Sequence, residues 1–349
     1  MTFARYWPVL ILAAFVVVLS AGCAPKPADQ TTPAVTPPGP SSTPSAPGAQ
    51  PLKGKKIGVS LLTKQHVFYQ DLQRAMEAEA KKQGAELIVV SAEFDAKTQD
   101  DQVDNFIVQK VDAMILCPAD SASVGGAVKK ANAAGIPVFT ADIAAKEGDV
   151  VCHIASDNKL GGKLAAQYLA KALVDKGNVI IIDHPAVVSV QDRTAGFDEE
   201  MKNHPGIKIV ARPPAEGQRT KAHDVMENML TAHPDLNGVF AINDDTGLGA
   251  LAACRAHKGA EKIIIVGFDA TPEALAEIIA GSQIKADVAQ HPAKMATATI
   301  DAIADFFAKK TLPKSMPIAV DVLDKPTLDK MKAAGTLKQV NGAWTLVEQ

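Results

Sequence analysis

Hydrogen-bonding side chains directly follow several of the strand-like apolar runs in this chain. Four such runs end at Asp142, Asn243, Asp269 and Gln290. Carboxylates accept hydrogen bonds, and carboxamides both accept and donate them, so together they can satisfy a ligand rich in neutral hydroxyl groups. The chemistry indicated is recognition of a polyhydroxylated molecule, provided that the strand ends lie close together.

Each of these residues also has a purely structural interpretation. An aspartate or asparagine after a strand is a common helix N-cap or turn former. For any single position the two interpretations carry about equal weight. The recurrence, with Asn243 and Gln290 adding amides to the carboxylates, favours a binding role.

Short apolar runs alternate with amphipathic stretches along most of the chain. The expected strands are Lys56–Leu62, Glu86–Ser91, Ala113–Cys117, Pro137–Thr140, Val179–Asp183, Ile207–Ala211, Gly238–Ala241, Ile263–Phe268 and Lys285–Ala289. The expected helices include Gln70–Gln83, Asp101–Lys110, Ser121–Ala134, Arg219–His233 and Pro292–Lys309. This alternation predicts α/β architecture, with two doubly wound parallel-sheet lobes covered by helices on both faces. Ligands of such sheets bind beyond the carboxyl ends of the strands, where the four polar residues lie.

The first residues indicate export. Arg5 precedes an apolar run over Val9–Leu19, which is too short to cross a bilayer comfortably. The following Leu-Ser-Ala-Gly-Cys, ending at Cys23, resembles the bacterial lipobox, in which the cysteine is acylated and becomes the first mature residue. We therefore expect a signal peptide over 1–22 and a lipid on Cys23, on the outer face of the cell membrane or in the periplasm. The alternative is a cysteine beside an ordinary signal cleavage site.

A Pro/Thr/Ser-rich segment over 23–53 follows this cysteine, with prolines at positions that include Pro37, Pro38, Pro40 and Pro44. Such a composition cannot bury enough apolar surface to fold, so it predicts an extended tether.

Beyond the tether the composition is globular; the whole chain of 349 residues has 47% hydrophobic residues and a formal net charge of −3. A near-neutral chain without a basic block does not fit nucleic-acid binding. Cys117, Cys152 and Cys254 have no CxxC or Cys/His spacing, so we expect small buried side chains rather than a disulfide or a metal site.

Several sequence blocks resemble the ribose-binding type of periplasmic sugar receptor, a type I periplasmic binding protein. The blocks are His153-Ile154-Ala155-Ser156-Asp157-Asn158, Gly161-Gly162-Lys163, Leu230-Thr231-Ala232-His233-Pro234-Asp235, Phe240-Ala241-Ile242-Asn243-Asp244 and Val266-Gly267-Phe268-Asp269-Ala270-Thr271-Pro272. The resemblance runs from about Lys56 to Asp321. It implies a three-segment hinge between an N-terminal lobe (54–157 plus 291–320) and a C-terminal lobe (158–290 plus 321–349). It also implies a monomer that closes on a sugar or polyol and delivers it to the permease of an ABC importer.

The resemblance carries over to individual positions. His66, Phe68 and Tyr69 fall on the loop that supplies a polar residue and aromatic rings in the family. Asp142, Asn243, Asp269 and Gln290 match its contacts to sugar hydroxyls, and Arg193 matches a binding arginine. Aromatic faces pack against sugar C–H groups, while charged groups make the stronger hydrogen bonds to hydroxyls.

Three positions depart from the family pattern. Val67 replaces the usual proline, Ile143 replaces the arginine that often follows the cleft aspartate, and the segment 214–218 lacks the far-lobe aromatic residue. Without the arginine donor and the far-lobe aromatic ring, the site can satisfy a different arrangement of ligand hydroxyl groups. A different pentose, a hexose or a polyol therefore fits as well as ribose. His66 either adds a contact or is a solvated loop histidine.

Other classes fit less well. Gly247–Ala252 has a loose GxGxxA pattern but lies inside an expected helix, so helix packing explains it better than dinucleotide binding. A glycoside hydrolase would need one carboxyl group held protonated, which no sequence feature indicates. A sugar-sensing repressor would begin with a DNA-binding helix-turn-helix. We expect a binding protein without catalysis, cofactor or metal; a chemotaxis or two-component sensory role remains the alternative to transport.

Overall fold

The computed structural model describes residues 51–347. The predicted signal peptide, Cys23 and nearly all of the predicted tether lie outside these residues. None of the helices in the described part has the length and apolar character needed to cross a membrane.

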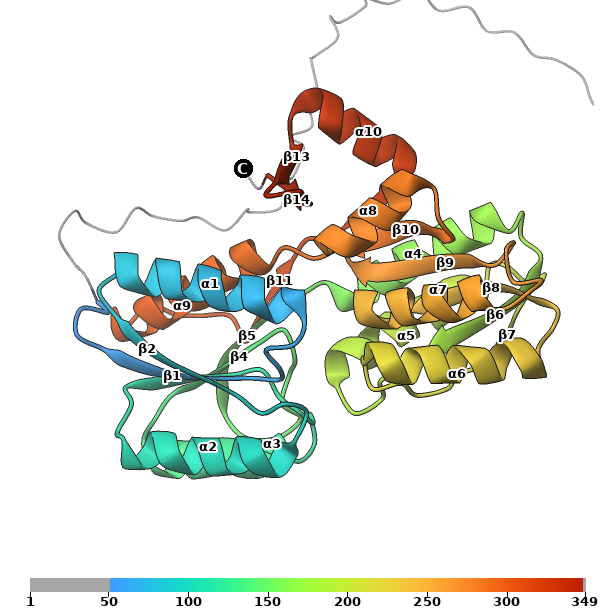
Figure 1. Cartoon of the computed structure of the whole chain (residues 1–349). Helices are drawn as coiled ribbons and strands as arrows, with labels where there is room; N and C mark the ends of the chain where they lie inside the picture. The colour runs from blue at the N-terminus through green and yellow to red at the C-terminus, as the bar shows by residue number, and fades with distance from the viewer. Residues whose placement is uncertain (1–50, 348–349) are drawn as a thin grey trace, which may run out of the picture. The chain divides into compact units, whose positions relative to one another are not determined.

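The first sheet has six parallel strands in the order β11-β5-β4-β3-β1-β2. Its strands are β1 (Lys56–Leu61), β2 (Glu86–Ser91), β3 (Ala113–Leu116), β4 (Val138–Ala141), β5 (Val150–Ser156) and β11 (Ser315–Ile318). Helices α1 (Val67–Lys82) and α9 (Pro292–Phe307) cover one face, and α2 (Ala96–Val108) and α3 (Val124–Ala133) cover the other (Figure 1). This N-terminal lobe buries apolar side chains on both faces of its sheet, as its apolar strand sequences require.

The second sheet repeats this arrangement in the order β12-β10-β9-β8-β6-β7. Its strands are β6 (Gly177–Ile182), β7 (Ile207–Ala211), β8 (Leu236–Ala241), β9 (Ile264–Asp269), β10 (Ile284–Ala289) and β12 (Asp321–Asp324), and only β12 runs antiparallel. Helices α4 (Asn158–Ala172) and α5 (Val188–Met201) pack on one face, and α6 (Arg219–Ala232), α7 (Asp244–Ala256) and α8 (Pro272–Ala280) on the other. This is the C-terminal lobe.

The chain crosses between the two sheets three times, after β5, after β10 and after β11. The predicted class, two doubly wound lobes joined by a three-segment hinge, is confirmed. Both sheets have the same strand order. In the first sheet β1 lies between β2 and β3, and in the second sheet β6 lies between β7 and β8. The chain therefore reverses its direction of winding at β1 and at β6, and this reversal is the topological switch point of each sheet.

Most predicted strands and helices occur within a few residues of their expected bounds. The prediction omitted β5, β11 and β12, and also the last elements α10 (Lys325–Ala334), β13 (Leu337–Val340) and β14 (Ala343–Leu346). Edge strand β11 and hairpin strand β14 alternate between exposed and half-buried positions, so neither contains the apolar run that marks a buried strand. The hairpin β13–β14 and α10 lie against α8.

Two close helix contacts depend on glycine. A Cβ atom at Gly162 of α4 would collide with the Arg193 carbonyl oxygen of α5, and one at Gly196 would collide with the Lys159 carbonyl oxygen. The paired glycines therefore let α4 and α5 approach closely and fix the position of Arg193.

Helix packing also accounts for the GxGxxA pattern. It lies within α7, where a Cβ atom at Gly249 would collide with the Arg219 carbonyl oxygen of α6. Cys117, Cys152 and Cys254 are all buried and unpaired, so the expectation of small buried side chains is confirmed.

Candidate ligand-binding site

One cavity of about 40 Å³ brings together every side chain predicted for the site. These residues are His66, Phe68, Tyr69, Asp142, Arg193, Asn243, Asp269 and Gln290. They come from α1 and its preceding loop, from the ends of β4, β8, β9 and β10, and from α5. The repeated topology explains this convergence, because the carboxyl ends of both parallel sheets face the cavity.

Asp142 lies at the end of β4 in a left-handed backbone conformation, with φ 64°. Its amide donates to the Ile154 carbonyl oxygen at 2.9 Å, which ties this turn to β5. The Tyr69 hydroxyl donates to Asp142 Oδ2 at 2.5 Å, whereas Oδ1 is buried without a hydrogen-bond partner. Burial raises the pKa of Asp142, although the Arg193 guanidinium and the Tyr69 hydroxyl oppose that shift. The unpartnered oxygen is ready to accept a hydrogen bond from a ligand.

Asp269 ends β9, and Gln290 follows β10. Gln290 Nε2 donates to Asp269 Oδ1 at 2.6 Å, while Ser156 Oγ donates to Gln290 Oε1 at 2.6 Å. Burial raises the pKa of Asp269 well above its usual range, and the Arg193 cation acts against this. Gln290 thus connects the C-terminal lobe to the end of β5 in the N-terminal lobe.

Arg193 supplies the cation of the site. Its Nε donates to Asn158 Oδ1 at 2.9 Å, and its Nη1 donates to the Ile242 carbonyl oxygen at 2.6 Å. Nη1 also lies 3.9 Å from Asp269 Oδ1, and the guanidinium carbon stands 3.7 Å from the centre of the Phe268 ring. The group is 4% exposed, so these contacts hold it in one orientation.

Asn243 has both of the functions considered for it from sequence. It caps α7 by accepting from the Thr246 amide at 2.9 Å, and its Nδ2 donates to the Gly217 carbonyl oxygen at 3.1 Å. It also lines the cavity. A carboxamide has two donor hydrogens and two acceptor lone pairs, so the cap leaves capacity for a ligand.

The first turn of α1 and its N-cap residue His66 contribute an aromatic wall. The His66 and Tyr69 rings stack with their centres 6.2 Å apart, and Phe68 meets Tyr69 edge to face at 5.1 Å. His66 is not a solvated loop residue: its side chain is 12% exposed, and Nε2 lies 3.3 Å from Asp245 Oδ2. Burial lowers the pKa of His66, and the nearby Asp245 carboxylate opposes this.

His184 was missed by the sequence analysis. It follows β6, lines the same cavity and is 6% exposed, and burial lowers its pKa to about 4. Gly217, with φ 69°, stands in the segment that lacks the family's aromatic ring, and a Cβ atom there would lie 3.5 Å from His184 Nδ1 and 3.7 Å from His66 Cε1. Two imidazole rings, those of His66 and His184, therefore lie beside Gly217. His184 directly follows the predicted strand Val179–Asp183, so applying the expectation that ligand-binding residues follow the strands to this strand as well would have identified it.

The two lobes touch across this cavity. The Ser121 amide donates to the Ala186 carbonyl oxygen at 3.1 Å, and the Val188 amide donates to Ser121 Oγ at 3.0 Å. The cavity holds only a few water molecules at about 15 Å³ each. The small volume and the contacts between the lobes show that, in this structure, the lobes lie close together around the cavity.

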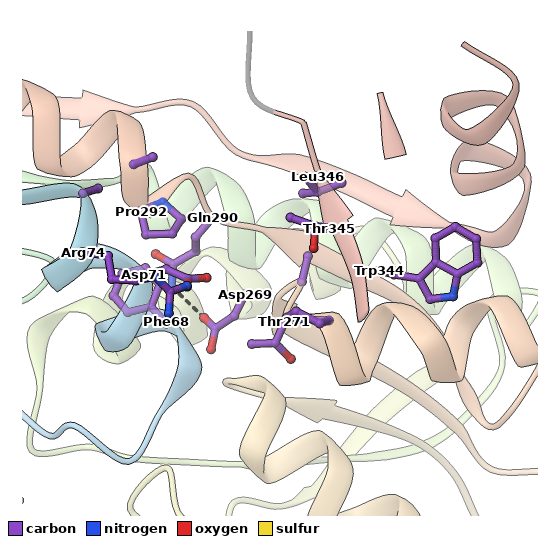
Figure 2. Close-up of a pocket in the computed structure, with 14 residues that line it drawn as sticks. Phe68, Asp71, Arg74, Asp269, Thr271, Gln290, Pro292, Trp344, Thr345 and Leu346 are labelled. Atoms are coloured by element: carbon purple, nitrogen blue, oxygen red, sulfur yellow. Dashed lines mark hydrogen bonds and ion pairs between the residues drawn. The ribbon is translucent and has the colours of Figure 1, made fainter. Parts of the chain in front are cut away.

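A larger cavity of about 450 Å³ lies where Phe68, Asp269 and Gln290 meet the hairpin β13–β14 (Figure 2). Its other walls include Trp344, Leu346 and Pro292, together with Arg74, whose side chain is 70% exposed. We assign the binding site to the smaller cavity, because Asp142, the buried guanidinium of Arg193 and the imidazoles of His66 and His184 line it and do not line the larger one.

The fold and this cleft define a two-lobed protein that encloses a small ligand between its lobes. Over residues 57–311 the chain matches the model of the periplasmic binding protein domain. A ribose import binding protein of Bacillus subtilis is 36% identical over 261 residues, which cover 74% of this chain and 84% of the relative. The chain belongs to the periplasmic binding protein family.

Two further comparisons show the range of known ligands. A xylitol-binding protein of Mycolicibacterium smegmatis is 32% identical over 268 residues, 76% of each chain. A crystal structure of an ABC transporter periplasmic solute binding protein from Actinobacillus succinogenes, with bound D-allose, has a TM-score of 0.73 at 30% identity and covers 79% of this chain and 99% of that one.

Proposed function

We propose that this protein binds a monosaccharide or polyol outside the cytoplasm and delivers it to an ABC importer. Relatives named for ribose and xylitol, and the related structure with D-allose, support this class of ligand. The site residues proposed are the predicted set: His66, Phe68, Tyr69, Asp142, Arg193, Asn243, Asp269 and Gln290.

The observation that carries this proposal is the buried, unpartnered Oδ1 of Asp142. Leaving a buried acceptor unsatisfied costs about 1–3 kcal/mol, more when it is charged. A ligand hydroxyl would remove this cost on binding. The cleft also offers Arg193 as a donor and aromatic faces for C–H groups, which together suit a sugar better than a charged or purely apolar ligand.

The mechanism that we propose is hinge closure. A ligand first meets one lobe, and the other lobe then rotates to complete the hydrogen bonds and exclude water. The ligand favours the closed state because only that state offers contacts from both lobes. We place the lobe boundaries at 54–157 plus 291–320 and at 158–290 plus 321–349, because these divisions follow the three crossings between the sheets.

Calorimetric titration of the chain from Leu52 onward tests the function. The panel is D-ribose, D-allose, xylitol and other pentoses, hexoses and polyols, and we expect one or more to bind with micromolar or tighter affinity. The recovered ligand should be chemically unchanged, because we propose a receptor without catalysis. Failure of every sugar and polyol to bind, or conversion of the bound compound, would contradict the proposal.

Attachment to the membrane through lipid on Cys23 is the second part of the proposal, with the tether holding a monomeric receptor near its permease. In a bacterial host, we expect the full chain to incorporate labelled palmitate and to fractionate with membranes. Cys23→Ser should abolish labelling and release the protein. Equal membrane association of the variant and the unchanged chain would contradict lipid anchoring.

A further inference from the structure

Two buried carboxyl groups face each other behind the turn that carries Asp269. Asp287 lies on β10 and is 0% exposed, and Asp244 is the first residue of α7 and is 3% exposed. Neither belongs to the predicted set of ligand contacts. An aspartate inside the interior strand β10 is unusual, because buried strands of parallel sheets are mostly apolar.

Each carboxyl group uses one oxygen to hold the turn after β9. Asp287 Oδ1 accepts from the Ala270 amide at 3.0 Å, and Asp244 Oδ2 accepts from the Thr271 amide at 2.6 Å. The turn is strained, with φ 121° at Asp269 and φ 62° at Ala270. Such backbone persists only where surrounding contacts determine it, and here the contacts come from the two carboxyl groups. Figure 2 shows Asp269 and Thr271 on this turn.

The other two oxygens point toward one another. Asp244 Oδ1 and Asp287 Oδ2 are buried, and neither accepts a hydrogen bond from a donor in the described part of the chain, so the opposing carboxyl group is the group with which each can pair. Gly267 makes room for them: a Cβ atom there would lie 3.1 Å from Asp244 Oδ1 and would collide with Asp287 Oδ2. A hydrogen bond between carboxyl groups requires a proton on one of them.

Neighbouring carboxylates also make it unfavourable for Asp244 and Asp287 to be ionised at the same time. The groups facing it are Asp245, beside Asp244 on α7, and Asp269 at the end of β9. Their cationic partners are Arg219, 2.9 Å from Asp245 Oδ1, and Arg193, 3.9 Å from Asp269 Oδ1. Burial is the largest cause that raises the pKa of both Asp244 and Asp287.

We propose that Asp244 and Asp287 share one proton and act as positioning residues that hold the strained turn 269–271 in its binding geometry. The inference rests on the proposed function only for the role of Asp269 as a ligand contact. Its physical basis is that two adjacent buried carboxylates cannot both be ionised at low cost.

A pH dependence follows from the raised pKa. The folded pair holds a proton that the unfolded chain has already released, so the free energy of unfolding falls as pH rises through the folded pKa of the pair. Loss of this proton leaves two carboxylates in contact, and their repulsion should loosen the turn. Affinity should decline over the same pH range.

The variant Asp287→Asn tests the shared proton directly. Its Oδ1 can still accept from the Ala270 amide, while its Nδ2 hydrogen replaces the shared proton toward Asp244 Oδ1. We expect this variant to lose the decline in unfolding free energy with rising pH. It should bind D-ribose, D-allose or xylitol, whichever binds the unchanged protein, within about threefold of the affinity of the unchanged protein.

The variant Asp287→Ala should behave differently, because it removes the acceptor for Ala270 and leaves Asp244 Oδ1 unpaired. We expect amide hydrogen exchange at Ala270 and Thr271, measured by NMR, to accelerate at least about tenfold, with affinity about tenfold weaker. Asp101→Asn, on the exposed surface of α2, is the matched control and should change neither measurement.

Two results would overturn the inference: a pH profile of unfolding free energy for Asp287→Asn equal to that of the unchanged protein, or amide exchange in Asp287→Ala as slow as in the unchanged protein. If Asp287→Ala does not fold, Asp287→Asn and the equivalent Asp244→Asn decide by their pH profiles. Exchange and unfolding measurements need no sugar, so they stand even if the proposed ligand class is wrong.

Discussion

Asp142→Ala should abolish most of the ligand-induced stabilisation of this protein while the fold remains. The substitution removes the acceptor Oδ1 and the partner of the Tyr69 hydroxyl. Hydrogen bonds to charged groups contribute about 1.5–3 kcal/mol, so affinity should fall about 10- to 150-fold. At a ligand concentration 100 times the original Kd, a 100-fold loss would reduce the stabilisation from about 2.7 to about 0.4 kcal/mol. Thermal unfolding with and without the ligand measures this change.

Backbone strain must be separated from loss of the carboxylate in this experiment. Alanine tolerates the left-handed conformation at position 142 less well than aspartate, whereas asparagine tolerates it about equally. Asp142→Asn should therefore keep the stability of the free protein and still lose affinity. Unchanged affinity in both variants would show that the site has been assigned incorrectly.

Arg193→Met should weaken both the fold and the binding. It removes the donors to Asn158 Oδ1 and the Ile242 carbonyl oxygen, and it leaves Asp269 buried without a cation. Removing one partner of a buried ion pair costs about 3–5 kcal/mol. Because Arg193 Nη1 and Asp269 Oδ1 are as far apart as 3.9 Å, we expect the lower end of this range. The free energy of unfolding, measured by chemical denaturation, should fall by about 3 kcal/mol. The pKa of Asp269, which burial already raises, should increase further.

A double variant separates the structural role of Arg193 from its role in binding. Adding Asp269→Asn to Arg193→Met removes the unpaired buried charge, so part of the lost stability should return while binding does not. Arg193→Lys should retain the charge but not the fixed, forked donor geometry over Phe268, and affinity should remain weak. Full binding by the double variant would exclude Arg193 and Asp269 from the site.

Strand-end residues show how far the sequence predicts the site. Asp142, Asn243, Asp269 and Gln290 were identified because parallel topology places strand ends together, and all of them line the same cavity. The aromatic loop and Arg193 depended on the family resemblance instead. No local pattern indicates that a residue inside helix α5 reaches the ends of β8 and β9.

Asp244 and Asp287 illustrate what the sequence left undecided. An aspartate within the apolar run of β10 is visible in the sequence, but its partner lies 43 residues earlier on another element. Only the tertiary structure shows that the two carboxyl groups come close together, with Asp244 Oδ1 and Asp287 Oδ2 both beside the position that a Cβ atom of Gly267 would occupy.

The sequence alone determined the α/β class and the two lobes, because hydrophobic periodicity and composition are local properties, whereas the export signal stays a prediction from the first residues. The tertiary structure decided which oxygen of Asp142 lacks a partner, where His184 lies, and which buried carboxyl groups meet. These features depend on packing between residues that are distant in the chain. Small shifts of a helix decide which side chains come into contact, and the close approach of α4 and α5 at Gly162 and Gly196 is one example.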